Sequence, residues 1–106
     1  MELNAFRVEV AAQDRRLTAR FVGDLTLDAE DALKNAFAHA DFTARPAVVI
    51  DFASVPYVNS AGIAALLGTL IPLREQTSGI RFTGLSRHLE KIFRMTGFPA
   101  LVTMEK

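Results

Sequence analysis

Residues 48–67 read VVIDFASVPYVNSAGIAALL, and they indicate the architecture more directly than any other segment of the chain. The segment begins inside a β-branched run, 47–52. Runs of this kind form central strands that are buried on both faces of a parallel sheet. A short loop, 53–58, then leads into a helix. That helix opens at Asn59 or Ser60, because either side chain can cap its first turn.

The helix that follows has apolar residues almost all round, with small residues between the larger ones. A helix of that kind is usually deeply buried. The alternative is that its small residues form a flat docking surface beside Ser60. We expect Pro72 to kink the helix near Leu70 or to end it early, because proline loses a backbone hydrogen bond and clashes with the carbonyl of Gly68.

In the N-terminal part of the chain, apolar residues alternate with polar ones on either side of a polar turn at residues 14–16. This alternation predicts two strands that form a hairpin. A helix over 29–40 should follow, capped by Thr26 or Asp28, with acidic residues in its first turn. The alternating strand positions are Leu3, Phe6, Val8 and Val10, then Leu17, Ala19 and Phe21.

Toward the C-terminus, residues 80–83 form a short β-type run, and 101–103 are long enough for one last edge strand. Between them Ser86 should cap a third helix that Gly97 ends. The residues of this helix expected to face inward are Leu89, Ile92, Phe93 and Thr96.

The elements alternate in the order strand, strand, helix, strand, helix, strand, helix, strand, as they do in an α/β sandwich. We therefore expect residues 1–106 to form one α/β domain. Its sheet should be mixed and mostly parallel, with about five strands, an N-terminal hairpin and about three covering helices.

Composition excludes several classes of function. The 106 residues carry 12 Lys and Arg against 12 Asp and Glu, and this balance argues against a protein that binds nucleic-acid phosphates. The chain has no cysteine, which excludes disulfides, thiol nucleophiles and thiolate metal sites. The sequence shows no signal peptide and no run of apolar residues long enough to cross a membrane, so we expect a cytoplasmic protein.

The turn into the second helix holds the chemistry of interest, since ligands and modifications on open α/β sheets gather at the carboxyl ends of strands. Ser60 should present its hydroxyl at the positive end of that helix, although a plain capping role is also open. A hydrolase is a weaker interpretation, because Val58 stands where a nucleophile elbow needs glycine, and His39 and His88 are the only candidate bases. No phosphate-binding glycine loop and no metal-ligand spacing is present in the sequence, so we expect no cofactor and no metal.

Residues 48–67 resemble the STAS domain of bacterial anti-sigma factor antagonists, in which a strand ending in Asp, a short loop and Asp-Ser-(Ser or Thr)-Gly-(Leu or Ile) open the second helix. The resemblance extends through 80–86 and 92–98 and covers nearly the whole chain. Asn59 stands where the family usually has Asp, and Ala61 stands where a second hydroxyl is usual.

The resemblance implies a non-enzymatic regulator that binds other proteins. Ser60 matches the serine that such antagonists offer to a partner, an ATP-dependent anti-sigma factor serine kinase, and a serine phosphatase would reset it. The alternative is an unphosphorylated STAS scaffold or a transport-associated interaction module, and a weak homodimer stays open. The basic stripe Arg87, Lys91 and Arg94 is either a solvated face or a contact for an acidic partner. The expected partner-binding residues are Tyr57, Asn59, Ser60, Ala61, Gly62, Ala64, Ala65 and Gly68.

Overall fold

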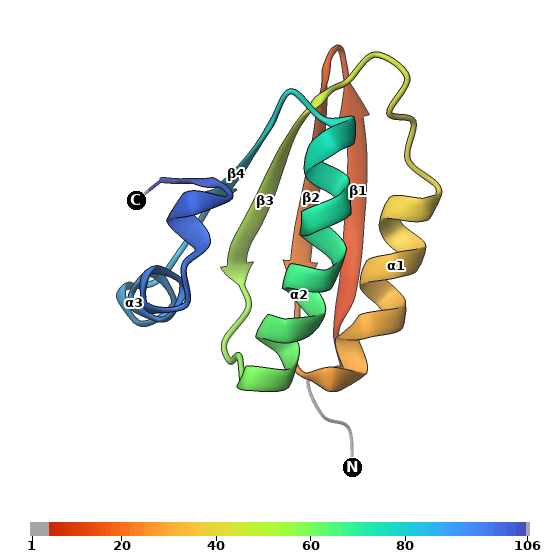
Figure 1. The fold of residues 1–106 in the computed structure, drawn as a ribbon. Helices are drawn as coiled ribbons and strands as arrows, with labels where there is room; N and C mark the ends of the chain where they lie inside the picture. The colour runs from red at the N-terminus through yellow and green to blue at the C-terminus, as the bar shows by residue number, and fades with distance from the viewer. Residues whose placement is uncertain (1–4, 106) are drawn as a thin grey trace.

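A computed structural model of the chain describes residues 5–105. The hairpin, the three helices and the alternating order predicted from the sequence are all present (Figure 1). Short 3₁₀ turns precede α1, follow α2 and follow α3. The elements are β1 (Arg7–Gln13), β2 (Arg16–Val22), α1 (Glu30–Ala38), β3 (Ala47–Ser54), α2 (Ser60–Leu73), β4 (Gly79–Thr83), α3 (Arg87–Met95) and β5 (Thr103–Met104).

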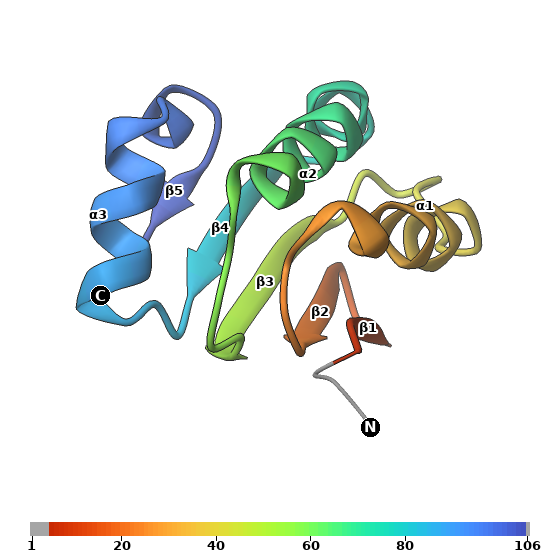
Figure 2. The same ribbon diagram turned by 90° about the horizontal axis from the view of Figure 1, so that it is seen from below.

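The five strands form one mixed sheet in the order β1-β2-β3-β4-β5. Strand β1 pairs antiparallel with β2, and every other neighbouring pair is parallel. The predicted fold class, an α/β fold with a mostly parallel sheet and an N-terminal hairpin, is confirmed. All three helices lie on the same side of the sheet, and the other side carries none (Figure 2).

Because the helices cover one face only, the prediction that the central strand is buried on both faces is wrong. In β3 the residues Val48, Ile50 and Phe52 are buried, whereas the alternate residues Val49 and Asp51 are partly exposed on the open face. A β-branched run permits burial on both faces, but burial of both faces also requires helices on both sides of the sheet.

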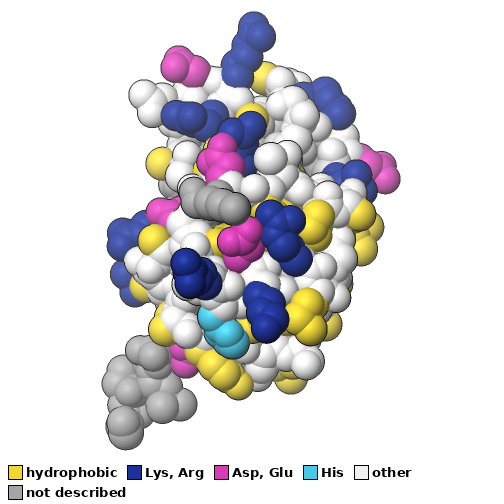
Figure 3. All heavy atoms as spheres, turned by 90° about the vertical axis from the view of Figure 1, so that its left-hand side faces the viewer, with side chains coloured by type: hydrophobic (Ala, Val, Ile, Leu, Met, Phe, Trp, Pro, Cys, Tyr) yellow, Lys and Arg dark blue, Asp and Glu magenta, His cyan; other side chains and the backbone are white. Residues whose placement is uncertain are grey.

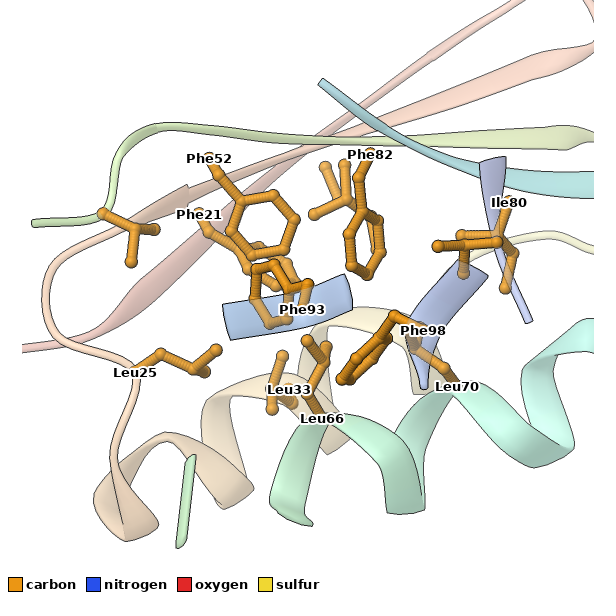
Figure 4. Close-up of a cluster of buried hydrophobic side chains, with 14 of the residues drawn as sticks. Phe21, Leu25, Leu33, Phe52, Leu66, Leu70, Ile80, Phe82, Phe93 and Phe98 are labelled. Carbon is orange, nitrogen blue, oxygen red and sulfur yellow. The ribbon is translucent and has the colours of Figure 1, made fainter. Parts of the chain in front are cut away.

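The core between the sheet and the helices is built from phenylalanine side chains contributed by strands and by the C-terminal region (Figure 4). Phe52 of β3 lies with its ring centroid 4.7 Å from that of Phe82 and 5.1 Å from that of Phe93. Phe98, just after α3, packs on Phe93 at 4.9 Å. Tilted and edge-to-face ring pairs at these separations stabilise beyond the area they bury, by about 0.5–1.5 kcal/mol each. The cluster fastens α3 to the sheet.

Several predicted boundaries differ in the structure. Thr26 precedes a 3₁₀ turn, 27–29, and neither it nor Asp28 caps α1 through its side chain. Thr96, expected to face inward, is exposed at the end of α3, where its hydroxyl donates a hydrogen bond to the Ile92 carbonyl. The last strand is β5 rather than 101–103. Leu3 lies outside the described residues.

Helix α2 also runs further than expected. It continues through Pro72 to Leu73, so the early stop is wrong, and a 3₁₀ turn over Arg74–Gln76 follows without a break. Pro72 has no amide hydrogen to donate to the Gly68 carbonyl, yet the helix continues past it, and the Arg74 amide closes the last turn on the Leu70 carbonyl. Within residues 5–105, none of the helices has the length and apolar character needed to cross a membrane.

Candidate functional site

Two loops lie side by side at the carboxyl ends of β2 and β3, and together they position the start of α2. Leu25 forms an isolated parallel bridge with Val58. The Leu25 amide donates to the Tyr57 carbonyl at 2.9 Å, and the Asn59 amide donates to the Leu25 carbonyl at 3.2 Å. These bonds satisfy backbone groups that would otherwise be unpaired in the loops, so they fix where the helix begins.

Gly62 allows this close approach. A Cβ atom at this position would lie 1.9 Å from the Leu25 carbonyl oxygen and 2.3 Å from its carbon, and the obstacle is backbone rather than a movable side chain. Gly62 is itself buried. Glycine is therefore required here by the backbone of the neighbouring loop.

Asn59 is the residue that caps α2. Its backbone is extended, with φ −132° and ψ 177°, and its Oδ1 atom accepts a hydrogen bond from the Gly62 amide at 2.9 Å. Ser60 is therefore the first helical residue rather than the cap, which resolves the alternative left open by the sequence.

The Ser60 side chain is exposed, and its hydroxyl makes no hydrogen bond to any group within residues 5–105. The amides of the first helical turn have no partner inside the helix and point toward this end. Together with the aligned peptide dipoles they make the site favourable for an anion.

The surface that extends from Ser60 along α2 is uncharged. Helix α2 has no Asp, Glu, Lys or Arg, and its outward side carries Ala64, Gly68 and Ile71, of which Ile71 is 54% exposed. Next to the helix start, Tyr57 is 51% exposed. We call Tyr57, Ser60, Ala64, Gly68 and Ile71 the α2 surface.

The structure separates the predicted partner-binding residues into two groups. Tyr57, Ser60, Ala64 and Gly68 are exposed, and Asn59 and Ala61 are partly exposed. Gly62 and Ala65 are buried against the rest of the chain and offer no surface to a partner. The same holds for Leu66 and Leu70, so one side of α2 belongs to the core and the other faces solvent.

Two exposed apolar residues of this region were not predicted. Ile71 extends the outward spacing of Ala64 and Gly68 by three residues, so helical periodicity was a signal for it. Leu27, 62% exposed, lies in the 3₁₀ turn that contacts α2. Nothing in the sequence pattern links Leu27 to α2, because the 3₁₀ turn meets the helix only in the folded chain.

An open groove of about 750 Å³ lies at the far end of α2, away from Ser60. It runs between the end of α1 and the second half of α2, and its lining includes Phe42 and Gly68. Hydrogen bonds from Thr43 hold the pKa of Asp41, in the same lining, below its usual value. The Asp41 carboxylate is remote from the start of α2 and makes no hydrogen bond to Ser60.

The other polar candidates do not join Ser60. His39 ends α1, with its Nδ1 atom 2.8 Å from the Asn35 carbonyl, and His88 is exposed on α3. Neither histidine bonds to the Ser60 hydroxyl in the described structure. Within residues 5–105, no cluster of three or more His, Cys, Asp or Glu residues could hold a metal ion.

The predicted basic stripe on α3 is exposed. Arg94 pairs with Glu90 at 3.1 Å, whereas Arg87 and Lys91 form no ion pair with the described part of the chain. On the side of the molecule that includes α3, basic side chains alternate with acidic and hydrophobic ones rather than merging into one patch (Figure 3). This distribution is that of a mixed, solvated surface.

Comparison with solved structures places the fold among anti-sigma factor antagonists. An antagonist from Mycobacterium paratuberculosis superposes with a TM-score of 0.70 at 22% identity, covering 93% of this chain and 84% of that one. The antagonist SpoIIAA in its unphosphorylated form gives 0.67 at 19% identity, with 96% and 88% covered. Bacillus SpoIIAA in the phosphorylated form gives 0.65 at 18% identity, with 96% and 92% covered. At these identities the likeness shows a shared fold.

A search of curated proteins finds no significant match to the chain. A family model described as "Mlab, STAS domain" matches residues 8–103. The match spans the sheet, all three helices and the Ser60 turn. STAS domains are in general regulatory modules rather than catalysts. On this match and the shared fold, the chain belongs to the STAS domain family.

Proposed function

We propose that this STAS domain acts as an anti-sigma factor antagonist that binds an anti-sigma factor serine kinase through the α2 surface and is released when Ser60 is phosphorylated. The observation that supports this most is the division of roles at the helix start. Asn59 performs the capping, which leaves the Ser60 hydroxyl exposed and without a bond in the described structure.

The fold should tolerate a phosphate on Ser60. The group would add about −1.5 to −2 charges at the N-terminus of α2, where the helix dipole and free amides favour an anion by up to about 2 kcal/mol. Because Ser60 is exposed and holds no other element in place, the modification breaks no contact within the domain.

A bound partner would respond in the opposite way. The α2 surface is uncharged, so a partner that fits it would have to strip water from the phosphate without offering a compensating charge. A penalty of about 3 kcal/mol would weaken binding more than a hundredfold. The unmodified hydroxyl therefore permits the contact and the phosphate prevents it.

The partners follow from this scheme. The kinase would supply ATP and transfer phosphate to Ser60, and a serine phosphatase would restore the hydroxyl, so the domain itself needs no cofactor. Such a switch would operate in the cytoplasm. SpoIIAA, which shares the fold, is described in both unphosphorylated and phosphorylated forms.

A second candidate, an unphosphorylated STAS scaffold or transport-associated module, is favoured by one specific feature. Asn59 replaces the carboxylate that anti-sigma factor antagonists usually carry beside the serine, and Ala61 removes the second hydroxyl. In this alternative the α2 surface still binds a protein, but Ser60 is never modified.

The experiment that separates the two candidates begins with protein recovered from its native cell. Intact mass and peptide mapping should show an increment of about 80 Da on Ser60 in part of the population. Pull-down with Ser60→Ala should capture the kinase, whereas Ser60→Asp should lose it. Ser78→Asp, an exposed serine beyond the end of α2, serves as the matched control and should bind like the wild type. An unmodified Ser60 together with equal capture by all three variants would refute the switch and favour the scaffold.

A further inference from the structure

The outer edge of β1 is the longest unpaired edge of the sheet within residues 5–105. Strand β1 ends the strand order and spans seven residues, against two for β5 at the opposite end. Its pairing with β2 is regular from Arg7 to Gln13, and it contains no proline or bulge. Natural proteins usually shield long regular edges with proline, bulges or charged side chains, because exposed backbone groups invite a further strand, and β1 has only the charges of Arg7 and Glu9.

The side of β1 that faces the helices is apolar and incompletely covered. Its register with β2 places Val8 opposite Phe21 and Val10 opposite Ala19, both of which are buried. Phe6 packs edge-to-face on Phe21 at 5.2 Å. Yet Phe6 and Val8 are only partly buried, and Val10 is 39% exposed. One more strand would complete the cover that α1 begins (Figure 2).

The opposite side of β1 carries a pair of opposite charges. Arg7 and Glu9 lie two residues apart, their side chains meet at 3.0 Å, and both are well exposed. Two residues on one strand can each face the other on a second, antiparallel copy of that strand. Opposite charges placed directly across from each other stabilise a sheet, and like charges destabilise it.

We propose that β1 is a self-association edge, at which two copies of this chain join their sheets antiparallel with Val8 at the two-fold axis. This register places Arg7 opposite Glu9 of the other copy, twice, on the open face. It places Val8 opposite Val8 and Phe6 opposite Val10 on the helix side. Both faces of the joint are then complementary, as an isologous interface requires.

Neighbouring registers are poorer by the same rule. An axis at Glu9 or at Arg7 would place like charges opposite each other. An axis at Val10 would leave Arg7 facing Gln13 and Glu9 facing Ala11, with no ion pair across the joint.

A small interface of this kind predicts a weak, concentration-dependent dimer. It uses the edge of the sheet rather than the α2 surface, so it stands independently of the Ser60 switch.

The chain contains no cysteine, which makes the register directly testable by engineered disulfides. Under mild oxidation Val8→Cys should form a covalent dimer, because only a residue at the axis faces its own copy within disulfide reach. Val10→Cys is the control, and it is stringent because Val10 is the more exposed of the two. Cross-linking of Val10→Cys instead, of both variants equally, or of neither would overturn the proposal.

Charge reversal at Arg7 tests the same register without cysteine. In sedimentation across rising concentration, Arg7→Glu should weaken dimerisation about tenfold or more, because it sets two carboxylates opposite each other in both cross-strand pairs of the joint. Glu9 is left unchanged, because it also pairs with Arg20 of β2 at 3.4 Å within the chain. Arg87→Glu on α3 is the matched control and should dimerise like the wild type. A wild type that stays monomeric to roughly millimolar concentration, or an Arg7→Glu variant that dimerises as tightly as the wild type, would contradict the self-association edge.

Discussion

Two helices of this domain begin beside an exposed serine, and the fold uses only one of the two hydroxyls. At α3, Ser86 is the cap, and its Oγ atom accepts a hydrogen bond from the Leu89 amide at 3.1 Å. At α2 the cap is Asn59, and Ser60 follows it as the first helical residue with a free hydroxyl. A shift of one position therefore separates a serine that stabilises the fold from one that is available to a partner.

The two helix starts differ again three residues after the cap. The α3 start accommodates the large side chain of Leu89, which is buried in the core. The α2 start requires Gly62, because the backbone of Leu25 occupies the space that a Cβ would need. The α2 start is thus held by a second loop, and it stays in place without help from Ser60.

The largest expected effect concerns that second loop. Gly62→Ala should destabilise the domain by about 3 kcal/mol, because the added Cβ meets backbone that cannot move without displacing the Leu25–Val58 bridge. Gly68→Ala is the matched control in the same helix. A Cβ there meets nothing within 4 Å, so alanine should stabilise by roughly 0.5–1 kcal/mol. Urea unfolding measures both, and equal stability of the two variants would disprove the close approach.

The caps come next. Asn59→Ala and Ser86→Ala should each lower the free energy of unfolding by about 1 kcal/mol, since each leaves one amide of a first turn without its acceptor. Thermal unfolding should show a fall of roughly 4–8 °C for each variant. If Asn59→Ala had no effect, the Asn59 side chain would not stabilise the start of α2, and the division of roles between Asn59 and Ser60 would fail.

The smallest effect is expected at Ser60 itself. Ser60→Ala should change the free energy of unfolding by less than about 0.5 kcal/mol, as exposed residues outside a cap or a core usually do. Ser86→Ala, measured beside it, supplies the contrast between the two serines. If Ser60→Ala and Ser86→Ala lowered the free energy of unfolding by the same amount, the distinction between a capping and a non-capping serine would be wrong.

Much of the fold follows from local pattern. The alternation in β2, the turn before α2 and the glycine after α3 each have one dominant interpretation, and the structure agrees with them. Gly97, for example, ends α3 with φ 88°, a conformation that glycine adopts without strain. The prediction that β3 is buried on both faces was wrong, because the sequence of a β-branched strand does not indicate whether helices cover one face of the sheet or both.

The candidate site was less accessible to sequence reasoning. Ser60 and Gly62 stood out from their neighbours, but α2 is apolar on every side, so its pattern could not separate exposed Ala64 from buried Ala65. The start of α2 is held by backbone hydrogen bonds to Leu25, which lies far from it in the sequence. Only the folded structure shows these bonds. The exposed Leu27 could not be linked to α2 for the same reason, because its 3₁₀ turn meets the helix only in the folded chain.

In the described part of the chain the Ser60 hydroxyl bonds to no other group, so Ser60 should carry a phosphate without loss of stability. The decisive experiment is urea unfolding of the chain with phosphoserine incorporated at position 60, compared with the unmodified chain. We predict a free energy of unfolding that is unchanged or raised by up to about 2 kcal/mol, because the phosphate meets the positive end of α2. A loss of more than about 1 kcal/mol would show that the Ser60 hydroxyl supports the fold, and the proposed switch could not operate without destabilising the domain.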